Sequence, residues 1–439
     1  MVLNRVKIIV IIVAFLSLKI SYSQNNILLN LDEAVQMALS KNSDIIISNY
    51  QIAATKFALR EAKGNFLPKV YLNAQYNRNI NPKVLYLSES NTATKLGSEN
   101  EYSSSLNVTF PLFSAYNSSN KKIALTQLDL QNEGARGVRQ SIINSTKKIY
   151  FNYLIALELV KAQENLLKNV EETTADIKKR VKKGTLTDYD LASAKVQEAN
   201  AKNNLIEAQS NLIPSSNNLK NILGLDINDD LELTDSIKLI DDEMVFEDKS
   251  ELLIEKNSRL KQLEKEIELN QKKVQLVKSS YFPTVDVVGN YNYQTQANNF
   301  NVFNYNWVNT SLVGMQIRFN VFNGNITKQK VEQSKIAQKI AEEKREYASR
   351  EYQLQFKELR SQLEFSQQKI NVQKENMNLT AEALAISKKR YEFGVGTFLE
   401  VSNAELMYTQ ARLNWLKAIL EYKSAYYDFE LLIGKDEQL

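Results

Sequence analysis

The chain has 439 residues, a formal net charge of +4, and neither cysteine nor histidine. These absences exclude disulfides and cysteine nucleophiles, and they remove the commonest general base and transition-metal ligand. No catalytic constellation stands out, so the sequence predicts no enzyme, cofactor or metal site. Glycine and proline are scarce, at 12 and 5 residues, which favours long helices joined by few turns.

The first 23 residues have the pattern of a secretory signal peptide. Arg5 and Lys7 precede an apolar run at 8–18, and small residues end the segment at Ser23, after which we expect cleavage. The run has about eleven apolar residues against about twenty for a membrane-spanning helix, which disfavours an uncleaved anchor. Losing the three basic residues of this segment lowers the net charge from +4 to +1. A near-neutral mature chain without a basic patch argues against a nucleic-acid partner.

The second half of the chain repeats the first. KKRVKKGTLTDYDLASAK at 178–195 aligns without gaps to KKRYEFGVGTFLEVSNAE at 388–405, and LKNILG at 219–224 matches FELLIG at 429–434. An offset of about 210 residues indicates a duplicated structural half, since solenoid units have about 20 to 50 residues. The expected divisions are a first repeat at 24–224, an acidic linker or equatorial segment at 225–247, a second repeat at 248–434 and a tail at 435–439.

In chain order, each repeat predicts a helix, two strands, a very long helix and a final helix. The first repeat is expected to hold a helix at 31–63, capped by Asn30 and Glu33, strands near 69–79 and 102–113 around a polar loop at 80–101, and helices at 117–183 and 186–222. The second is expected to hold strands near 284–294 and 309–321, and helices at 325–392 and 398–433.

The two longest helices need partners along their whole length, because about 66 residues of helix are roughly 100 Å long. Gly184 in the first repeat, and Gly394 with Gly396 in the second, interrupt the helical pattern at matching positions. Glycine accepts the backbone conformations that a chain reversal needs. We therefore expect two helical hairpins with their turns near 184 and 394–397, at one end of a long helical assembly.

Each predicted strand alternates apolar and polar residues over about ten to thirteen positions, as a tilted strand crossing an outer membrane does. Ordinary strands packed on a core are the alternative, but these helices are too long to pack on so small a sheet. Asp286 and Arg318 fall on the polar face, where they could pair across strands, so we expect both in the lumen. Four strands cannot close a barrel, and open edges are costly in lipid. Several chains must share one barrel, and three would supply twelve strands.

These segments, in this duplicated order, resemble the TolC-like outer-membrane efflux protein family. The resemblance covers nearly all of the mature chain and rests on LNLDEAVQMALSKNSDI at 29–45, AKGNFLP at 62–68, KRYEFGVGTFLEVSNAE at 389–405 and AYYDFELLIG at 425–434. It implies a mainly α fold with four transmembrane β-strands per chain, in a homotrimer with a TolC-like α-barrel in the periplasm and a shared 12-stranded β-barrel in the outer-membrane lipid.

The resemblance further implies a passive exit duct of a tripartite efflux or type I secretion system. Its partners would be a periplasmic adaptor (membrane fusion) protein and an inner-membrane pump. Drugs, metals, metabolites and secreted proteins all use such ducts. The alternative function is an exported soluble coiled-coil scaffold or adhesin, which would have no need for four strands of membrane length.

In this family acidic residues ring the periplasmic constriction. Asp190 and Glu400 match in the repeat alignment, and in a trimer they would supply a ring of carboxylates that attracts cations. Alternatively, both are first-turn residues favoured by the helix dipole. The family's second acid falls near Asn403, which is not acidic, and Asp188 and Glu405 are possible substitutes. The expected adaptor contacts are the turn residues Lys183, Gly184, Thr185, Gly394, Val395, Gly396 and Thr397.

Overall fold

The computed structural model describes residues 26–87, 92–236, 251–301 and 304–435. The expected signal peptide at 1–23, residues 237–247 of the expected linker and residues 436–439 of the tail lie outside these described residues. The chain divides into two compact units, which we call the helical unit (Met1–Ile46, Val138–Ile254 and Leu354–Leu439) and the sheet unit (Ile47–Gly137 and Glu255–Gln353). Each unit takes segments from both sequence repeats, so the division into units cuts across the division into repeats.

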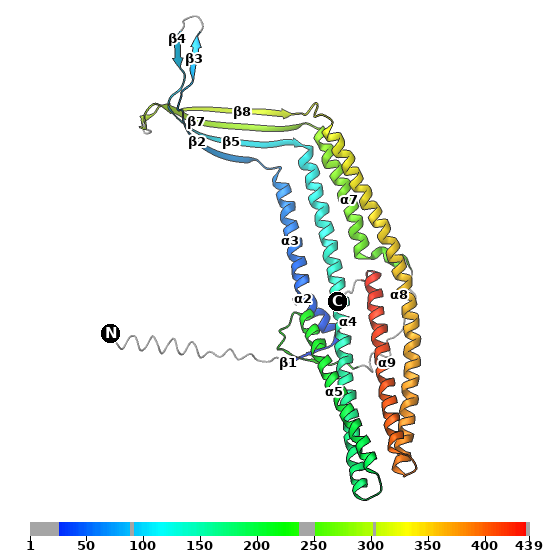
Figure 1. Ribbon diagram of the computed structural model, residues 1–439. Coiled ribbons are helices and arrows are strands. Elements are labelled where there is room, and N and C mark those ends of the chain that lie inside the picture. Colours follow the sequence, from blue (N-terminus) through cyan, green and yellow to red (C-terminus); the bar gives the residue numbers. More distant parts are fainter. Residues whose placement is uncertain (1–25, 88–91, 237–250, 302–303, 436–439) are drawn as a thin grey trace, which may run out of the picture. The chain divides into compact units, whose positions relative to one another are not determined.

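Two very long helices run through the structure, α4 (Ala115–Lys182) with 68 residues and α8 (Ile326–Glu392) with 67 (Figure 1). The shorter helices are α2 (Leu31–Lys41), α3 (Ser43–Gly64), α5 (Asp188–Leu223), α7 (Ser258–Lys278) and α9 (Phe398–Leu432), with 3-10 turns at Glu251–Lys256 and Ser279–Tyr281. No helix in the described part of the chain combines the length and the apolarity needed to span a bilayer.

The helix expected at 31–63 is instead two helices, α2 and α3, separated by Asn42. The backbone of Asn42 is extended, with ψ of 134°, which ends α2. Its side-chain amide donates to the carbonyl oxygen of Ile222 at 2.9 Å, and its side-chain oxygen accepts from the Asp44 N–H at 2.8 Å. Asn42 therefore links the end of α2 to the end of α5 and caps the start of α3. Because its backbone is extended, α2 and α3 cannot form one continuous helix. The capping box of Asn30 and Glu33 forms as expected.

The four expected strands form one antiparallel sheet in the order β2 (Lys69–Arg78), β5 (Asn100–Ser114), β7 (Thr284–Ala297) and β8 (Val308–Arg318). The last strand ends at Arg318, short of the expected 321, because its partner β7 begins at Thr284, the residue paired with Arg318. The pairing of β5 with β7 joins the two sequence repeats directly. The sheet is open, with β2 and β8 as its edges.

The register of the sheet separates an apolar face from a polar face. Apolar side chains share one face because Val70, Leu72 and Tyr76 pair with Val108, Leu106 and Tyr102, and Val287 pairs with Met315. The other face is rich in amides: Asn107 and Asn290 are paired, and the Asn290 amide donates to the Asn107 side-chain oxygen at 2.8 Å. The predicted alternation is therefore confirmed across all four strands.

Two small sheets were not expected from the sequence. β3 (Val84–Leu87) and β4 (Thr92–Lys95) form an antiparallel pair inside the expected polar loop. β1 (Asn26–Leu29) pairs in parallel with β6 (Asp230–Leu233), which lies in the expected linker or equatorial segment at 225–247. Tyr150 of α4 holds this second sheet, since its hydroxyl donates to Asp235 Oδ2 at 2.7 Å and lies 3.3 Å from the Leu29 carbonyl oxygen.

Candidate functional site

The site built from the duplicated glycine segments lies at the two hairpin turns of the helical unit (Figure 1). Gly184 and Gly394 both adopt left-handed backbone, with φ of 75° and 73°. The N–H of each glycine donates to the carbonyl three residues earlier, Val181 or Tyr391, and the next N–H donates to the carbonyl of Arg180 or Arg390. This bonding pattern satisfies carbonyls left open at a helix end, and only glycine adopts it without strain.

The same ending recurs where each repeat finishes. Gly224 and Gly434 are also left-handed, with φ of 66° and 64°, and each donates to the carbonyl three residues earlier. The glycine-based helix endings of the first repeat thus return 210 positions later in the second. The duplication is structural as well as sequential.

Asp190 and Glu400 occupy equivalent positions in the first turn of α5 and α9. Thr187 and Thr397 cap these helices, accepting from the N–H of Asp190 and Glu400 at 3.3 and 3.2 Å. Asp190 accepts in return from the hydroxyl and N–H of Thr187, at 2.7 and 2.9 Å, and these bonds lower the pKa of its carboxyl group. Glu400 instead lies 3.6 Å from the guanidinium of Arg390. Both acids therefore stabilise helix starts, whatever further role they have.

The other three acidic-ring candidates have different surroundings. Asp188 and Asn403 are exposed. Glu405 is buried, and its Oε1 lies 3.2 Å from both Asn169 Nδ2 and Lys388 Nζ. It also lines a cavity of about 70 Å³ between α4, α8 and α9. Glu405 therefore links three helices within one chain.

The two hairpins are also joined by residues that the sequence analysis did not single out. The guanidinium carbon of Arg180, near the end of α4, lies 5.0 Å from the ring centre of Tyr391, near the end of α8. Arg180 is held in place by Asp176, with Nε 2.8 Å from Oδ2. Ser402 of α9 donates to the side-chain oxygen of Gln197 of α5. The sequence did hold one signal for the Arg180–Tyr391 contact, because each of these residues lies a few positions before a turn glycine.

The turn residues expected to contact a partner are mostly exposed. Exposed positions include Lys183, Gly184, Thr185, Gly394, Val395 and Thr397, whereas Gly396 is half-buried against Arg390. The first turn also follows a run of exposed lysines, Lys178, Lys179 and Lys182. Phe393 adds a large apolar side chain beside the second turn. The accessible turns therefore combine positive charge with apolar groups.

Asp286 and Arg318, expected on the polar face, are brought together by the sheet. Arg318 Nη2 donates to Asp286 Oδ2 at 2.7 Å across β7 and β8. Asp286 is buried and Arg318 is largely exposed. The pair lies where the strands meet the helices, because β7 begins at Thr284 and β8 ends at Arg318.

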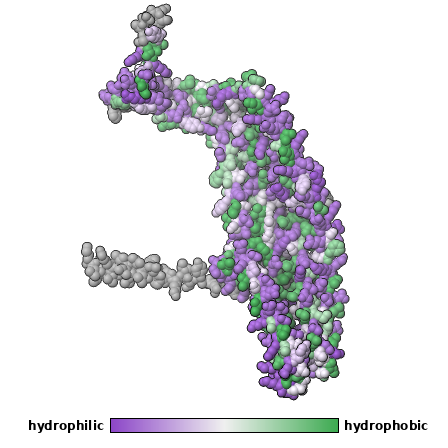
Figure 2. Space-filling view, viewed as in Figure 1, coloured by the Kyte–Doolittle hydropathy of each residue, from purple (hydrophilic) through white to green (hydrophobic). Residues whose placement is uncertain are grey.

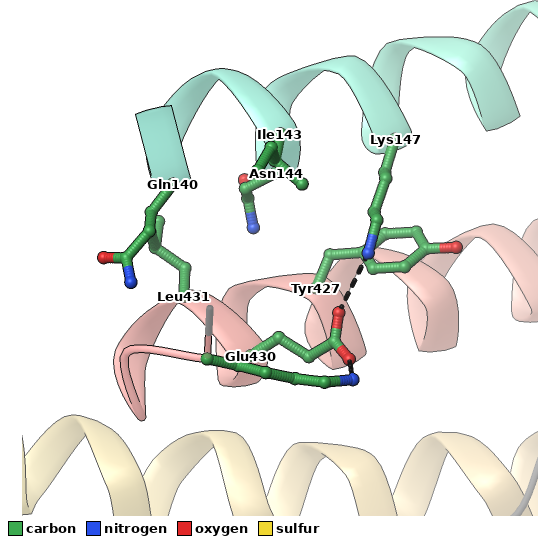
Figure 3. Close-up of a pocket in the computed structure, with 8 residues that line it drawn as sticks. Gln140, Ile143, Asn144, Lys147, Tyr427, Glu430 and Leu431 are labelled. Atoms are coloured by element: carbon green, nitrogen blue, oxygen red, sulfur yellow. Dashed lines mark hydrogen bonds and ion pairs between the residues drawn. The ribbon is translucent and has the colours of Figure 1, made fainter. Parts of the chain in front are cut away.

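A second charged cluster lies in the helical unit, at the opposite end of α9 from its turn (Figure 3). Glu430 is buried beside Lys147 of α4, with Oε2 3.2 Å from Nζ, and it also pairs with Lys435. Burial acts to raise the pKa of Glu430, but the two ammonium groups outweigh it and hold the pKa below the usual value. Nothing in the repeat pattern pointed to this cluster, because Lys147 belongs to the first repeat, Glu430 to the second and Lys435 to the tail.

Two outer helices of the helical unit carry apolar stripes that face solvent in the single chain. On the second half of α8 every seventh residue from Phe365 is a large exposed hydrophobe, namely Phe365, Val372, Leu379 and Ile386, and Phe393, just past the end of the helix, continues the spacing. On α5 the exposed hydrophobes form two pairs seven residues apart, Tyr189 with Val196 and Ile206 with Ile213, and the ten-residue step between the pairs fits the two apolar positions of a heptad. Figure 2 shows apolar side chains exposed among polar ones along the helices. A seven-residue spacing is the signature of a coiled-coil seam, so both stripes are suited to packing against another helix.

The model of the family described as outer membrane efflux protein matches residues 34–225 and 250–435. A structure of CusC, concerned with folding and transmembrane channel formation, has a TM-score of 0.74 at 16% identity and covers 95% of this chain and 96% of that chain.

Two further structures have the same fold. The Campylobacter jejuni CmeC outer membrane channel has a TM-score of 0.74 at 15% identity, over 92% of this chain and 85% of that one. The Vibrio cholerae outer membrane protein VceC has a TM-score of 0.72 at 16% identity, over 92% and 96%. No curated protein sequence matches this chain. Because the family model covers most of both repeats, the chain belongs to the outer membrane efflux protein family.

Proposed function

We propose that three copies of this chain form the exit duct of a tripartite efflux or type I secretion system. The duct is passive, and the energy for export comes from an inner-membrane pump. A periplasmic adaptor docks on the hairpin turns. The cargo passes through the assembled helices and leaves through a barrel that the three sheets build together in the outer membrane.

The observation that carries this proposal is the open four-stranded sheet with one apolar and one amide-rich face. In lipid its two edge strands, β2 and β8, would leave N–H and C=O groups unpaired at a cost of several kcal/mol each. Pairing β8 of one copy with β2 of the next removes both edges. Three copies give twelve strands, with the apolar face toward lipid and the polar face toward a lumen holding Asp286 and Arg318.

The apolar stripes support the same head-to-tail arrangement. They lie on different helices, α8 and α5, so one copy can pack its α8 stripe against the α5 stripe of the next. A contact between two different surfaces closes into a ring when the rotation permits. Each copy therefore presents the α8 stripe and the β8 edge to one neighbour, and the α5 stripe and the β2 edge to the other.

At the turns, the proposal gives Asp190 and Glu400 a second role beside capping. In a trimer these two residues per chain place carboxylates around one axis, where they favour cations. Asp188 and Asn403 are exposed nearby, whereas buried Glu405 acts through the helices it links. The exposed turn residues, Lys183 to Thr185 and Gly394 to Thr397, are the adaptor contacts.

The absence of cysteine makes a direct test possible. Asn290 and Tyr291 are neighbours on β7 and point to opposite faces. In intact outer membranes, Asn290→Cys should react with a charged, membrane-impermeant thiol reagent from the lumen, and Tyr291→Cys should not. The unmodified protein should need detergent for extraction and run as a heat-sensitive trimer. Equal labelling of both variants, or a monomer extracted without detergent, would favour the soluble scaffold or adhesin instead.

A further inference from the structure

The β3–β4 hairpin has no counterpart in the second repeat. It is inserted between Arg78, the last residue of β2, and Asn100, the first of β5, at the end of the sheet away from the helices (Figure 1). The equivalent connection between β7 and β8 spans only 298–307 and contains no strand among its described residues. The hairpin is thus an addition to one repeat, and closing a barrel does not require it.

The hairpin leaves an unusual amount of apolar surface in solvent. Val84, Leu85 and Tyr86 of β3 are 53%, 46% and 69% exposed, and Ile80, just before the hairpin, is 90% exposed. Because successive side chains in a strand alternate, Val84 and Tyr86 lie on one face and Leu85 on the other. Neither face of β3 is therefore covered over Val84 to Tyr86, and the backbone of β3 pairs with β4 alone.

The backbone of the hairpin is equally incomplete. β3 and β4 form a two-stranded sheet of their own, so each has one open edge. An isolated two-stranded hairpin is at best marginally stable in water. Proteins usually protect an exposed edge with charge or proline, but the VLYL sequence of β3 contains neither. Such a strand is a template for another strand.

We propose that the hairpins of neighbouring copies pair edge to edge, β3 of one against β4 of the next, and close over the outer end of the strand assembly. The inference rests on the proposed trimer. The hairpin continues from β2, the edge strand that meets the next copy in that trimer, so it starts at the subunit boundary. Three identical hairpins are then tethered around one axis, at an effective concentration in the millimolar range. Alternating β3 and β4 around this axis keeps every contact antiparallel.

Single-cysteine cross-linking tests this pairing in the otherwise cysteine-free chain. In the proposed ring, equivalent Leu85 positions lie two strands apart, or about 10 Å. Leu85→Cys should therefore give cross-linked dimers and trimers with a bismaleimide spanning about 10 Å. The control Leu312→Cys lies on the Asn290 face of β8, which the proposed lumen leaves open to reagent; it repeats only every four strands, about 20 Å apart along the barrel, and should stay uncross-linked.

Adding Tyr86→Lys to Leu85→Cys should abolish the cross-link while leaving the heat-sensitive trimer, because a charged edge resists pairing. Amide hydrogen exchange offers a second readout, because, of Leu85 and Tyr86, the one whose N–H points away from β4 should be protected only in the trimer. A trimer with fast exchange and no Leu85→Cys cross-link would overturn the hairpin pairing and leave the duct intact. A protein that forms no trimer would overturn both proposals.

Discussion

The guanidinium of Arg180 stacks on the ring of Tyr391, 5.0 Å from its centre, and so joins the two helical hairpins beside their turns. Arg180 belongs to the first repeat and Tyr391 to the second. Cation–π contacts contribute about 0.5–2 kcal/mol, depending on how far they are desolvated. Burial raises the pKa of Tyr391, so the ring stays neutral at physiological pH. This contact holds the hairpins together in the present arrangement, and its loss should make their separation easier.

Tyr391→Leu removes the aromatic face and keeps an apolar side chain. If the turns close the duct, we expect more frequent or larger openings in single-channel recordings of protein in planar bilayers. Tyr50→Leu is the matched control, because Tyr50 is 71% exposed on α3 and belongs to neither the turns nor the apolar stripes. Equal behaviour of the two variants would contradict a role for the Arg180–Tyr391 contact in closure.

Glu430→Gln should destabilise the helical unit, because it leaves Lys147 buried without its carboxylate. Removing one partner of a buried ion pair costs on the order of 3–5 kcal/mol. Thermal unfolding of detergent-purified protein, followed by circular dichroism, measures the loss. The control is Glu421→Gln on the same helix, where Glu421 forms a more exposed pair with Lys369 and should contribute only about 0–1 kcal/mol. Glu430→Leu combined with Lys147→Met should recover most of the stability.

The same glutamate predicts an acid dependence. The folded pKa of Glu430 lies below its usual value of 4.5, so the unfolded chain binds this proton more readily. Its stabilising contribution is therefore present above pH 4.5 and is lost as the pH falls through the folded pKa. The difference in unfolding temperature between wild type and Glu430→Gln should be constant from pH 7 to about pH 5 and shrink at lower pH. A difference that does not depend on pH would contradict the ion pair.

Gly137→Ala and Gly134→Ala should have opposite effects, although both lie within α4. A methyl group at Gly137 would lie 2.6 Å from Ser258 Oγ and 3.1 Å from Gln262 Nε2, whereas no atom lies within 4 Å of one at Gly134. Ser258 cannot easily move, since it donates to the Glu133 carbonyl at 2.9 Å. We expect Gly137→Ala to cost about 1–3 kcal/mol and Gly134→Ala to add about 0.5–1. Thermal unfolding of both variants checks the difference, and equal shifts would contradict close packing of α4 against α7.

The elements with strong periodicity were predictable from the sequence. The long helices and the four strands depend on patterns that recur many times, and the repeat doubles each signal. The left-handed conformations of Gly184 and Gly394 follow from the need to reverse the chain, and the structure has both. Local chemistry dictates these features, so no knowledge of the tertiary contacts was needed.

Features that depend on contacts between distant residues were not predictable. Asn42 interrupts a helical pattern because its amide reaches Ile222, 180 residues away. β6 forms because β1 lies beside it, and Glu405 is buried because Asn169 and Lys388 converge on it. The β3–β4 hairpin has strands of only four residues, which are too short for a periodicity signal. In each case the signal lies in a partner that the local sequence does not contain.

Asp190→Asn combined with Glu400→Gln separates the two roles of these acids. The asparagine side chain can still accept from Thr187, so the start of α5 should persist, while the trimer loses the Asp190 and Glu400 carboxylates and keeps that of Asp188. If those groups ring the constriction, the preference for potassium over chloride in bilayer recordings should fall toward unity. Glu207→Gln, which removes an exposed acid farther along α5, should leave the preference unchanged. An unaltered preference in the double variant, with circular dichroism showing intact helices, would restrict Asp190 and Glu400 to stabilising the ends of their helices.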